Sequence, residues 1–309
     1  MTVGTGTVRK ERKRFIKFWP LYLMLLPCII YYILICYVPM GGIVLAFKDY
    51  SFKKGIWGSP WVGMRYFKTF FTSFDCLRLL RNTLTVGFIK CVLEFPFAIL
   101  LALMLNEVRS MKFKKISQTI TYLPHFLSTV IIVTMMQRIL APNTGLLNQV
   151  IGKLGGDSGT FFLMDAKYFF RLLFSMDLWK NIGWNSIIYL AAISGIDPTL
   201  YEAASIDGCS KLKKMWHITI PCIRGTIGLL FIIGVGGLLS SGFEQIFLLR
   251  TPGNMSVADT LDTFVVRIGL MGGQFGYATA VGLVQGIVGL VLVIVCNKLS
   301  RKFTEVSLW

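Results

Sequence analysis

Apolar residues in this chain gather in long blocks rather than alternating with polar residues. Six blocks are each apolar over about 20 residues, the length that a helix needs to cross a hydrocarbon core of ~30 Å. A backbone inside a bilayer must satisfy its own hydrogen bonds, so each block is predicted to be a helix. Polar side chains interrupt the fourth block. The predicted spans are Leu21 to Phe47, Asn82 to Leu105, Ile120 to Leu140, Leu172 to Ile193, Cys222 to Leu239 and Ala278 to Leu299.

The composition places the chain among all-α integral membrane proteins. It has 309 residues, of which 54% are hydrophobic, and its mean hydropathy is +0.65. A soluble domain of this length cannot bury so much apolar surface. The net charge is +17, but the basic residues cluster beside the apolar blocks. Anionic lipid and the positive-inside rule therefore explain them better than a nucleic-acid partner does.

The basic clusters also predict the orientation of the chain in the membrane. Segments rich in Lys and Arg next to spans are expected to be cytoplasmic. Four segments are assigned to that side, at Arg9 to Lys17, Arg109 to Lys115, Lys211 to Lys214 and Lys298 to Lys302. The first outer loop breaks the pattern with seven Lys or Arg between Lys48 and Arg81, but it is long enough to be a folded external piece. Both termini are thus predicted to be cytoplasmic. The domain organisation follows as a basic tail (1–18), a six-span transmembrane domain (19–300) and a C-terminal tail (301–309), with an external loop at 47–81 and a cytoplasmic loop at 197–221. The first apolar block is expected to stay as a span, since it is too long for a signal peptide.

The cytoplasmic loop at 197–221 has the pattern of a helix, a turn and a second helix. Asp197 is a good N-cap and Pro198 suits the first helical position. Gly208 can adopt the left-handed conformation that ends a helix, and Ser210 can cap the next helix. A short structured projection with small side chains suits docking into a groove of another protein, and Glu202 offers it a carboxylate.

The residues of this loop resemble the "EAA" signature of ABC importer permeases. Glu202, Ala203 and Ala204 are followed at the expected spacing by Gly208, Ile218 and Pro221, with Ile220 where the usual pattern has Leu. Further segments resemble the carbohydrate branch of that family, which includes the maltose-type permeases and those for oligosaccharides and polysaccharide fragments. These segments are Ser59-Pro-Trp-Val-Gly63, Tyr122-Leu-Pro-His125, Gly183-Trp-Asn-Ser186 and Phe243-Glu-Gln-Ile-Phe247.

The resemblance implies the type I importer permease fold and a set of partners. These partners are a second related permease, two ABC ATPase subunits, an extracytoplasmic solute-binding protein and a carbohydrate substrate. It also implies that the ATPase couples to this chain through Glu202, Ala203, Ala204, Asp207, Gly208 and Pro221. The chain has no Gly-x-x-x-x-Gly-Lys-Ser/Thr phosphate loop, so ATP and Mg²⁺ are expected on the partner ATPase rather than here. We expect no cofactor, no metal site and no catalytic residue in this subunit.

Polar residues inside the predicted spans are candidates for the substrate pathway, because ionisable groups are costly in a membrane. A sugar site combines flat aromatic rings with amides and carboxylates. The candidates with this character are Trp179, Asn181, Trp184, Asn185, Tyr189, Glu244, Gln245 and Gln285. These polar residues also have simpler interpretations that do not involve a substrate. Lys90 and Glu94 are expected to neutralise each other within one helix. The tryptophans can act as interfacial anchors beside ion pairs between helices, and Glu244 and Gln245 can instead contact the binding protein.

Three other function classes compete with the sugar permease. The first is an ABC permease for a solute that is not a sugar. The second is a secondary transporter, which needs carboxylates for a coupling ion and usually an internal repeat. The third is a membrane-embedded enzyme, which needs a nucleophile, base or metal constellation. Neither the repeat nor the catalytic constellation is visible in the sequence, and neither rival class accounts for the projection at 197–221.

Overall fold

The computed structural model describes residues 5–237 and 242–304, and this part of the chain is helical apart from connecting segments and one isolated bridge between Lys48 and Trp61. The prediction of an all-α protein is therefore confirmed. Leu239, at the end of the fifth predicted span, lies outside the described residues, and so do residues 305–309 of the C-terminal tail.

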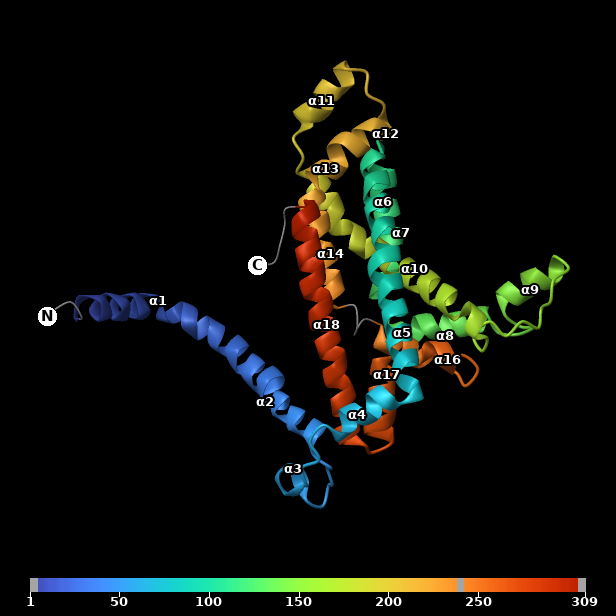
Figure 1. Cartoon of the computed structure of the whole chain (residues 1–309). Helices are drawn as coiled ribbons and strands as arrows, with labels where there is room; N and C mark the ends of the chain where they lie inside the picture. Colours follow the sequence, from blue (N-terminus) through green and yellow to red (C-terminus); the bar gives the residue numbers. More distant parts are fainter. Residues whose placement is uncertain (1–4, 238–241, 305–309) are drawn as a thin grey trace.

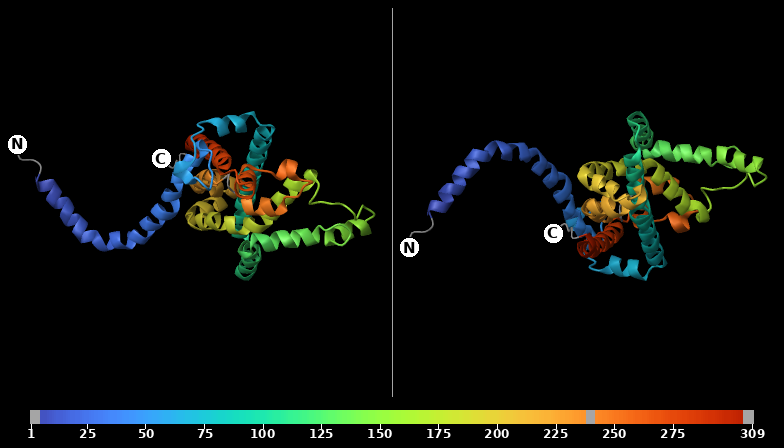
Figure 2. Two further views of the ribbon diagram at one scale, coloured as in Figure 1. Left: turned by 90° about the horizontal axis from the view of Figure 1, so that it is seen from below. Right: turned by 90° about the horizontal axis from the view of Figure 1, so that it is seen from above.

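The first predicted span forms an arm that leaves the rest of the molecule (Figure 1). Its most apolar window has 0% of its residues buried, over a helical stretch that runs from Phe18 to Phe47. Views from below and above show the same separation (Figure 2). The helix begins within the predicted basic tail, since its first element starts at Thr5. The arm consists of α1 (Thr5–Tyr31), η1 (Tyr32–Tyr37), α2 (Val38–Met40) and η2 (Gly41–Phe47).

Long helices form the body of the molecule (Figure 1). The second span is one helical stretch of 34 residues, Phe74–Glu107, so it begins eight positions before the predicted Asn82. It comprises α5 (Phe74–Phe88), η3 (Ile89–Leu93) and α6 (Glu94–Glu107). The last span lies in α18 (Phe275–Thr304). Between them runs α10 (Ala166–Ser194), which packs closely against α6.

One predicted span is bent within its length, and a second bend lies at the start of another. The third predicted span is interrupted by a turn of 98° between the helical stretches Met111–Phe126 and Thr129–Ile139. Pro124 lies in the short η4 (Leu123–Phe126) just before this turn, and it lacks the N–H that a continuous helix needs. The prediction of one continuous helix from Ile120 to Leu140 was therefore wrong. At the start of the fifth predicted span, the stretch Lys211–Cys222 meets α14 (Arg224–Gly236) at an angle of 63°, just after Pro221.

Three helices in the described residues are long and apolar enough to cross a membrane, or up to five if each bent pair counts as one span. The fourth predicted span, within α10, is not among them. Its hydropathy is reduced by Asp177, Lys180 and its amides. The fold is thus a multi-span helical membrane protein, and six spans remain a prediction.

Short helices lie in the segments that connect the long helices. The segment after the arm contains α3 (Gly55–Gly58) and α4 (Arg65–Thr72). Between the second span and α10 lie α7 (Met111–Tyr122), α8 (Thr129–Ile139) and α9 (Leu146–Lys153). The remaining connections contain α11 (Pro198–Ile206), α12 (Lys211–Lys214), η5 (Met215–Thr219), α13 (Ile220–Cys222), α15 (Phe243–Leu249), α16 (Met255–Ala258), α17 (Leu261–Val266) and η6 (Arg267–Met271).

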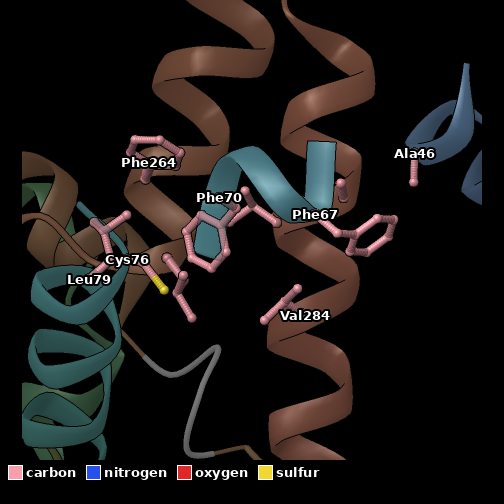
Figure 3. Packing of buried hydrophobic residues seen from close by; sticks show 10 residues of the cluster. Ala46, Phe67, Phe70, Cys76, Leu79, Phe264 and Val284 are labelled. Carbon is pink, nitrogen blue, oxygen red and sulfur yellow. The ribbon is translucent and has the colours of Figure 1, made fainter. Parts of the chain in front are cut away.

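A buried apolar cluster anchors α4 to the body (Figure 3). Phe67 and Phe70 of α4 pack with Leu79 of α5, Phe264 of α17 and Val284 of α18. Burying a large side chain of this kind stabilises a structure by about 1.5–3 kcal/mol. The cluster therefore fixes the Phe74 end of the second span against the last span.

Candidate functional site

The predicted helix–turn–helix forms a projection at one end of the molecule, built from α11, α12, η5 and α13 (Figure 1). We call residues 197–222 the coupling projection. The Asp197 carboxylate accepts a hydrogen bond of 3.0 Å from the backbone N–H of Thr199, which holds the pKa of Asp197 below its usual value. Ser210 caps the second helix by accepting from the backbone N–H of Lys213. Both predicted caps are thus confirmed.

Gly208 ends α11 in the left-handed conformation, with φ of +71°. The N–H of Cys209 donates to the carbonyl of Ala204 at 2.9 Å, and the N–H of Gly208 donates to the carbonyl of Ser205 at 3.2 Å. This pair of bonds is the Schellman motif. A Cβ at Gly208 would meet nothing within 4 Å, so glycine is required for the backbone angle and not for space.

The signature residues lie on the outside of this projection. Four of them are exposed: Glu202, Ala203, Asp207 and Pro221. Ala204 is the buried residue of α11. Large apolar side chains are exposed beside them, namely Leu200, Ile206, Leu212 and Trp216. The projection is held to the body by a 2.9 Å hydrogen bond between the hydroxyls of Tyr201 and Thr219 and by the ion pair Lys211–Glu107 at 3.0 Å. An exposed, capped and apolar projection has the features of a docking element.

A polar cavity of about 610 Å³ lies between the second span, α10 and α15. Four of the predicted pathway residues line it: Asn181, Asn185, Glu244 and Gln245. A neighbouring cavity of about 340 Å³ shares Lys90, Glu94 and Asn185 with it and is lined also by Trp184 and Tyr189. The two cavities together combine amides, carboxylates and an indole, which is the composition expected of a sugar path.

Lys90 joins three of the elements around this cavity. Its ammonium lies 3.1 Å from the Asp177 carboxylate of α10 and donates a 2.9 Å hydrogen bond to the Gln245 amide oxygen of α15. The Lys90 side chain is 11% exposed and that of Asp177 is 9% exposed. The expected neutralisation of Lys90 by Glu94 within one helix was therefore wrong, because the inter-helix carboxylate is the group that reaches the ammonium.

The local backbone explains why Lys90 can reach so far. It lies in the π-helical η3, whose wider turn redirects side chains and is frequent at functional sites. Gly242 precedes α15 with φ of +92°, and a Cβ there would lie 2.6 Å from the Lys90 ammonium nitrogen. Glycine at position 242 thus makes room for the ammonium at the break before α15.

A pair of aromatic rings lies where α10 meets η4. The Trp184 indole stacks on the His125 imidazole with centroids 4.5 Å apart and planes 3° from parallel. His125 Nδ1 lies 3.0 Å from the Asn181 amide oxygen, and the Asn181 amide donates to Asp177 at 3.0 Å. Hydrogen bonds and the ion pair therefore connect His125 to Gln245 through Asn181, Asp177 and Lys90. We call these five residues the polar chain.

Gly183 allows this arrangement, because α10 approaches α7 closely at this point. A Cβ on Gly183 would lie 2.1 Å from the carbonyl oxygen of Thr121. Only a residue without a side chain permits such contact between helices. The approach brings Trp184 beside His125.

The other predicted pathway residues lie apart from the polar cavity. Trp179 is half exposed and lines neither of the two cavities. Gln285 lines a different cavity, beside Gly236, and donates to the Asp262 carboxylate at 2.8 Å. Tyr189 is 2% exposed and packs edge-on against Phe95, so it contributes mainly to the core beneath the smaller cavity.

The predicted pathway residues did not include Lys90, Asp177 or His125. The signal for Lys90 and Asp177 was their charge within apolar spans, but their pairing depends on the packing of η3 against α10. No sequence pattern predicted that His125 lies beside Trp184. The two residues were noted only because each belongs to a segment that resembles the carbohydrate branch.

The fold and the projection agree with a known family. Residues 94–304 match the family described as "Binding-protein-dependent transport system inner membrane component". The chain belongs to that family. The match covers more than half of the chain and includes the coupling projection and every lining residue of the polar cavity except Lys90 and Cys91, which confirms the resemblance drawn from the signature residues.

Relatives within this family share most of their length with the chain. The polygalacturonan/rhamnogalacturonan transport system permease protein YteP of Bacillus subtilis (strain 168) is 46% identical over 289 residues, 94% of this chain and 90% of that protein. Protein LplB of the same organism is 43% identical over 289 residues, covering 94% and 91%. The arabinooligosaccharides transport system permease protein AraP of that organism is 32% identical over 240 residues, covering 76% and 73%.

Solved structures of this kind extend the comparison to the fold. A crystal structure of a bacterial ABC transporter involved in the import of the acidic polysaccharide alginate contains a chain that is 40% identical, with a TM-score of 0.89. It covers 96% of this chain and 99% of that chain. A second structure, of a bacterial alginate ABC transporter in complex with an alginate pentasaccharide-bound periplasmic protein, has a TM-score of 0.88. The predicted type I importer permease fold is thus confirmed.

Proposed function

We propose that this chain is the membrane-spanning permease subunit of an ATP-driven importer for oligosaccharides, itself without catalytic activity. The observation that carries the proposal is the coupling projection, which is exposed, capped at both helices and placed at one end of a family fold. ATP hydrolysis is assigned to two partner ATPase subunits, since no phosphate loop occurs in this sequence. Closure of the ATPases would move α11, and the attached helices would pass that movement to the polar cavity.

A sugar substrate is supported by the cavity and by the relatives. Two of the relatives are named for the transport of polygalacturonan/rhamnogalacturonan and of arabinooligosaccharides, and the structural neighbours are alginate ABC transporters. The cavity offers amide and carboxylate groups at Asn181, Asn185, Glu244 and Gln245, with the Trp184 indole beside them. Hydrogen-bonding groups of this kind suit sugar hydroxyls, and an indole suits the apolar face of a pyranose.

A second permease subunit is supported by the arm. The apolar window within Phe18–Phe47 is wholly unburied in the single chain, while the other candidate spans bury 39% and 22% of theirs. A related permease beside the body would give one side of the arm a protein surface in addition to lipid. The basic clusters at both ends favour cytoplasmic termini, with the coupling projection on that side.

Reconstitution of the four-component importer in proteoliposomes tests this proposal. The probes are labelled galacturonan, rhamnogalacturonan and arabinan fragments with the cognate binding protein. We expect uptake of at least one fragment only when ATP is present. We also expect Trp184→Leu to change the preference among fragments without changing assembly, with Trp179→Leu as the matched control outside the cavities.

Other outcomes would distinguish the rival functions. ATP-driven uptake of a solute other than a sugar would replace the substrate assignment and keep the permease. Uptake by this chain alone, driven by an ion gradient without ATP, would refute the proposal and favour a secondary transporter. Equal fragment preference in wild type and Trp184→Leu would refute the assignment of the cavity to the sugar path.

A further inference from the structure

The segment between the arm and α4 protrudes from the molecule at the end opposite the coupling projection (Figure 1). We call residues 48–61 the outer knob. It contains the short α3 (Gly55–Gly58), which lies beyond α4 and the lower end of α18 in that view. The function proposed above assigns no role to this part of the chain.

Hydrogen bonds give the outer knob a defined internal structure. The N–H of Asp49 donates to the Pro60 carbonyl at 2.9 Å, closing the base of the loop. The buried Ser59 hydroxyl donates to the Gly55 carbonyl at 2.6 Å and accepts from the N–H of Ser51 at 3.1 Å. Lys48 donates to the Ile56 carbonyl at 2.9 Å across the loop. These bonds make it a folded element and not a loose connection.

The knob is also seated firmly on the last span. The Phe275 ring meets those of Tyr50 and Phe52 edge-on, at centroid distances of 5.8 and 5.2 Å. A Cβ on Gly276 would lie 2.7 Å from both the Lys48 carbonyl oxygen and the Tyr66 ring. The start of α18 therefore supports the knob by direct contact, so a force on the knob reaches α18.

The outer side of the knob combines exposed aromatic rings with positive charge. Trp57 is 89% exposed and Phe52 is 76% exposed. Lys53 and Lys54 are exposed beside them. Residues 48–68 carry five Lys or Arg against a single carboxylate, that of Asp49, for a net charge of +4. An exposed tryptophan on a fixed loop is typical of the anchor residues of protein interfaces.

A groove of about 430 Å³ continues this surface along α4. It is lined by Val62, Met64, Arg65, Lys68, Thr69 and Thr72, of which Arg65 and Lys68 are exposed cations. We call it the α4 groove. The outer knob and the α4 groove are both positively charged, and they follow one another along the chain. We therefore treat them as one surface that a single partner would contact.

We propose that the outer knob and the α4 groove form the docking surface for the solute-binding protein, with Trp57 inserted into an apolar slot that is bordered by carboxylates. This inference rests on the proposed function. The structural neighbour described above was solved with a periplasmic protein, so a partner of this kind has access to the end of such a fold that faces away from the ATPases. A membrane-interface belt would lie level with the ends of the spans, whereas α3 protrudes beyond α18 (Figure 1).

A photo-crosslinking amino acid at position 57 tests which partner covers the knob. The experiment uses the assembled importer in nanodiscs with the loaded binding protein. We expect a crosslink from position 57 to the binding protein, and none from position 19, where Trp19 is exposed on the arm. A crosslink from position 57 to lipid or to the second permease would overturn the proposal.

Affinity measurements on the same complex test the chemistry. Trp57→Ala is expected to weaken binding of the binding protein by at least about thirtyfold, the loss typical of an interface anchor. The double variant Lys53→Glu/Lys54→Glu should weaken it by about tenfold at low salt, with a smaller loss at high salt because exposed charges are screened. Basal ATPase activity should not change. The matched control is Lys153→Glu/Lys167→Glu, which makes the same charge change on exposed lysines of α9 and the start of α10.

The outcomes separate this inference from the proposed function. Unchanged affinity in both knob variants, or an equal loss in the control, would refute the knob as docking surface while ATP-driven sugar uptake still supported the permease. A wild-type complex that does not import sugar with ATP would refute the proposed function itself.

Discussion

The coupling projection and the polar cavity differ in how far apart along the chain their parts lie. In the projection, hydrogen bonds join residues 2 to 18 positions apart, as in Asp197–Thr199 and Tyr201–Thr219. Beside the cavity, the hydrogen bonds of the polar chain that join different elements link residues 56 and 155 positions apart, as in His125–Asn181 and Lys90–Gln245. A docking element can thus be encoded locally, whereas a path through the membrane is assembled from several spans.

The largest effect is expected from removing the charge at the centre of the polar chain. Lys90→Met leaves Asp177 buried without its ion-pair partner, which costs about 3–5 kcal/mol when one member of a buried pair is lost. Thermal unfolding of the purified protein in detergent measures the loss. The double variant Lys90→Met/Asp177→Asn should recover part of the stability, because no uncompensated charge remains. A Lys90→Met protein as stable as wild type would show that the polar chain does not hold the cavity together.

A smaller effect is expected where α10 meets α7. Gly183→Ala places a methyl group against the Thr121 carbonyl, so the helices must separate, at about 1–3 kcal/mol for overpacking. The His125–Trp184 stack should loosen, and tryptophan fluorescence should report it. Gly195→Ala is the matched control, since its nearest neighbour would lie at an ordinary 3.5 Å. Equal behaviour of the two variants would contradict the close approach as the cause.

The smallest effect is expected at the surface of the projection. Lys211 and Glu107 form an ion pair whose side chains are 60% and 34% exposed, so its net contribution is less than about 1 kcal/mol. Lys211→Ala should reduce thermal stability slightly at low salt and not measurably at high salt. A large loss that persists at high salt would mean that the projection depends on this pair more than on its caps.

The sequence predicted the projection well for physical reasons. A capping residue, a proline at the first helical position and a glycine with positive φ each act within a few residues of themselves, so Asp197, Pro198 and Gly208 could be assigned without a structure. Apolar length likewise predicted the arm, the second span and the last span.

The rest depended on contacts that no local pattern encodes. Pro124 lay inside an apolar block that was long enough to span, and the 98° turn became visible only with α8 in place. Lys90 had a candidate partner four residues away in Glu94, but the π-helical turn of η3 directs it to Asp177 instead. Gln285 and Trp179 had suitable chemistry for the sugar path, yet the packing of their helices places them outside the polar cavity.

The most direct test of the central claim is the number of sugar molecules imported per ATP hydrolysed by Gly208 variants. Gly208→Val forces a β-branched residue into φ of +71°, at roughly 1–2 kcal/mol or about tenfold in an equilibrium. Gly208→Asn adds a side chain of similar volume, but asparagine tolerates the left-handed conformation. We predict that Gly208→Val hydrolyses ATP with about tenfold less sugar import per ATP, while Gly208→Asn remains close to wild type. A wild-type ratio in Gly208→Val would contradict the assignment of force transmission to the coupling projection.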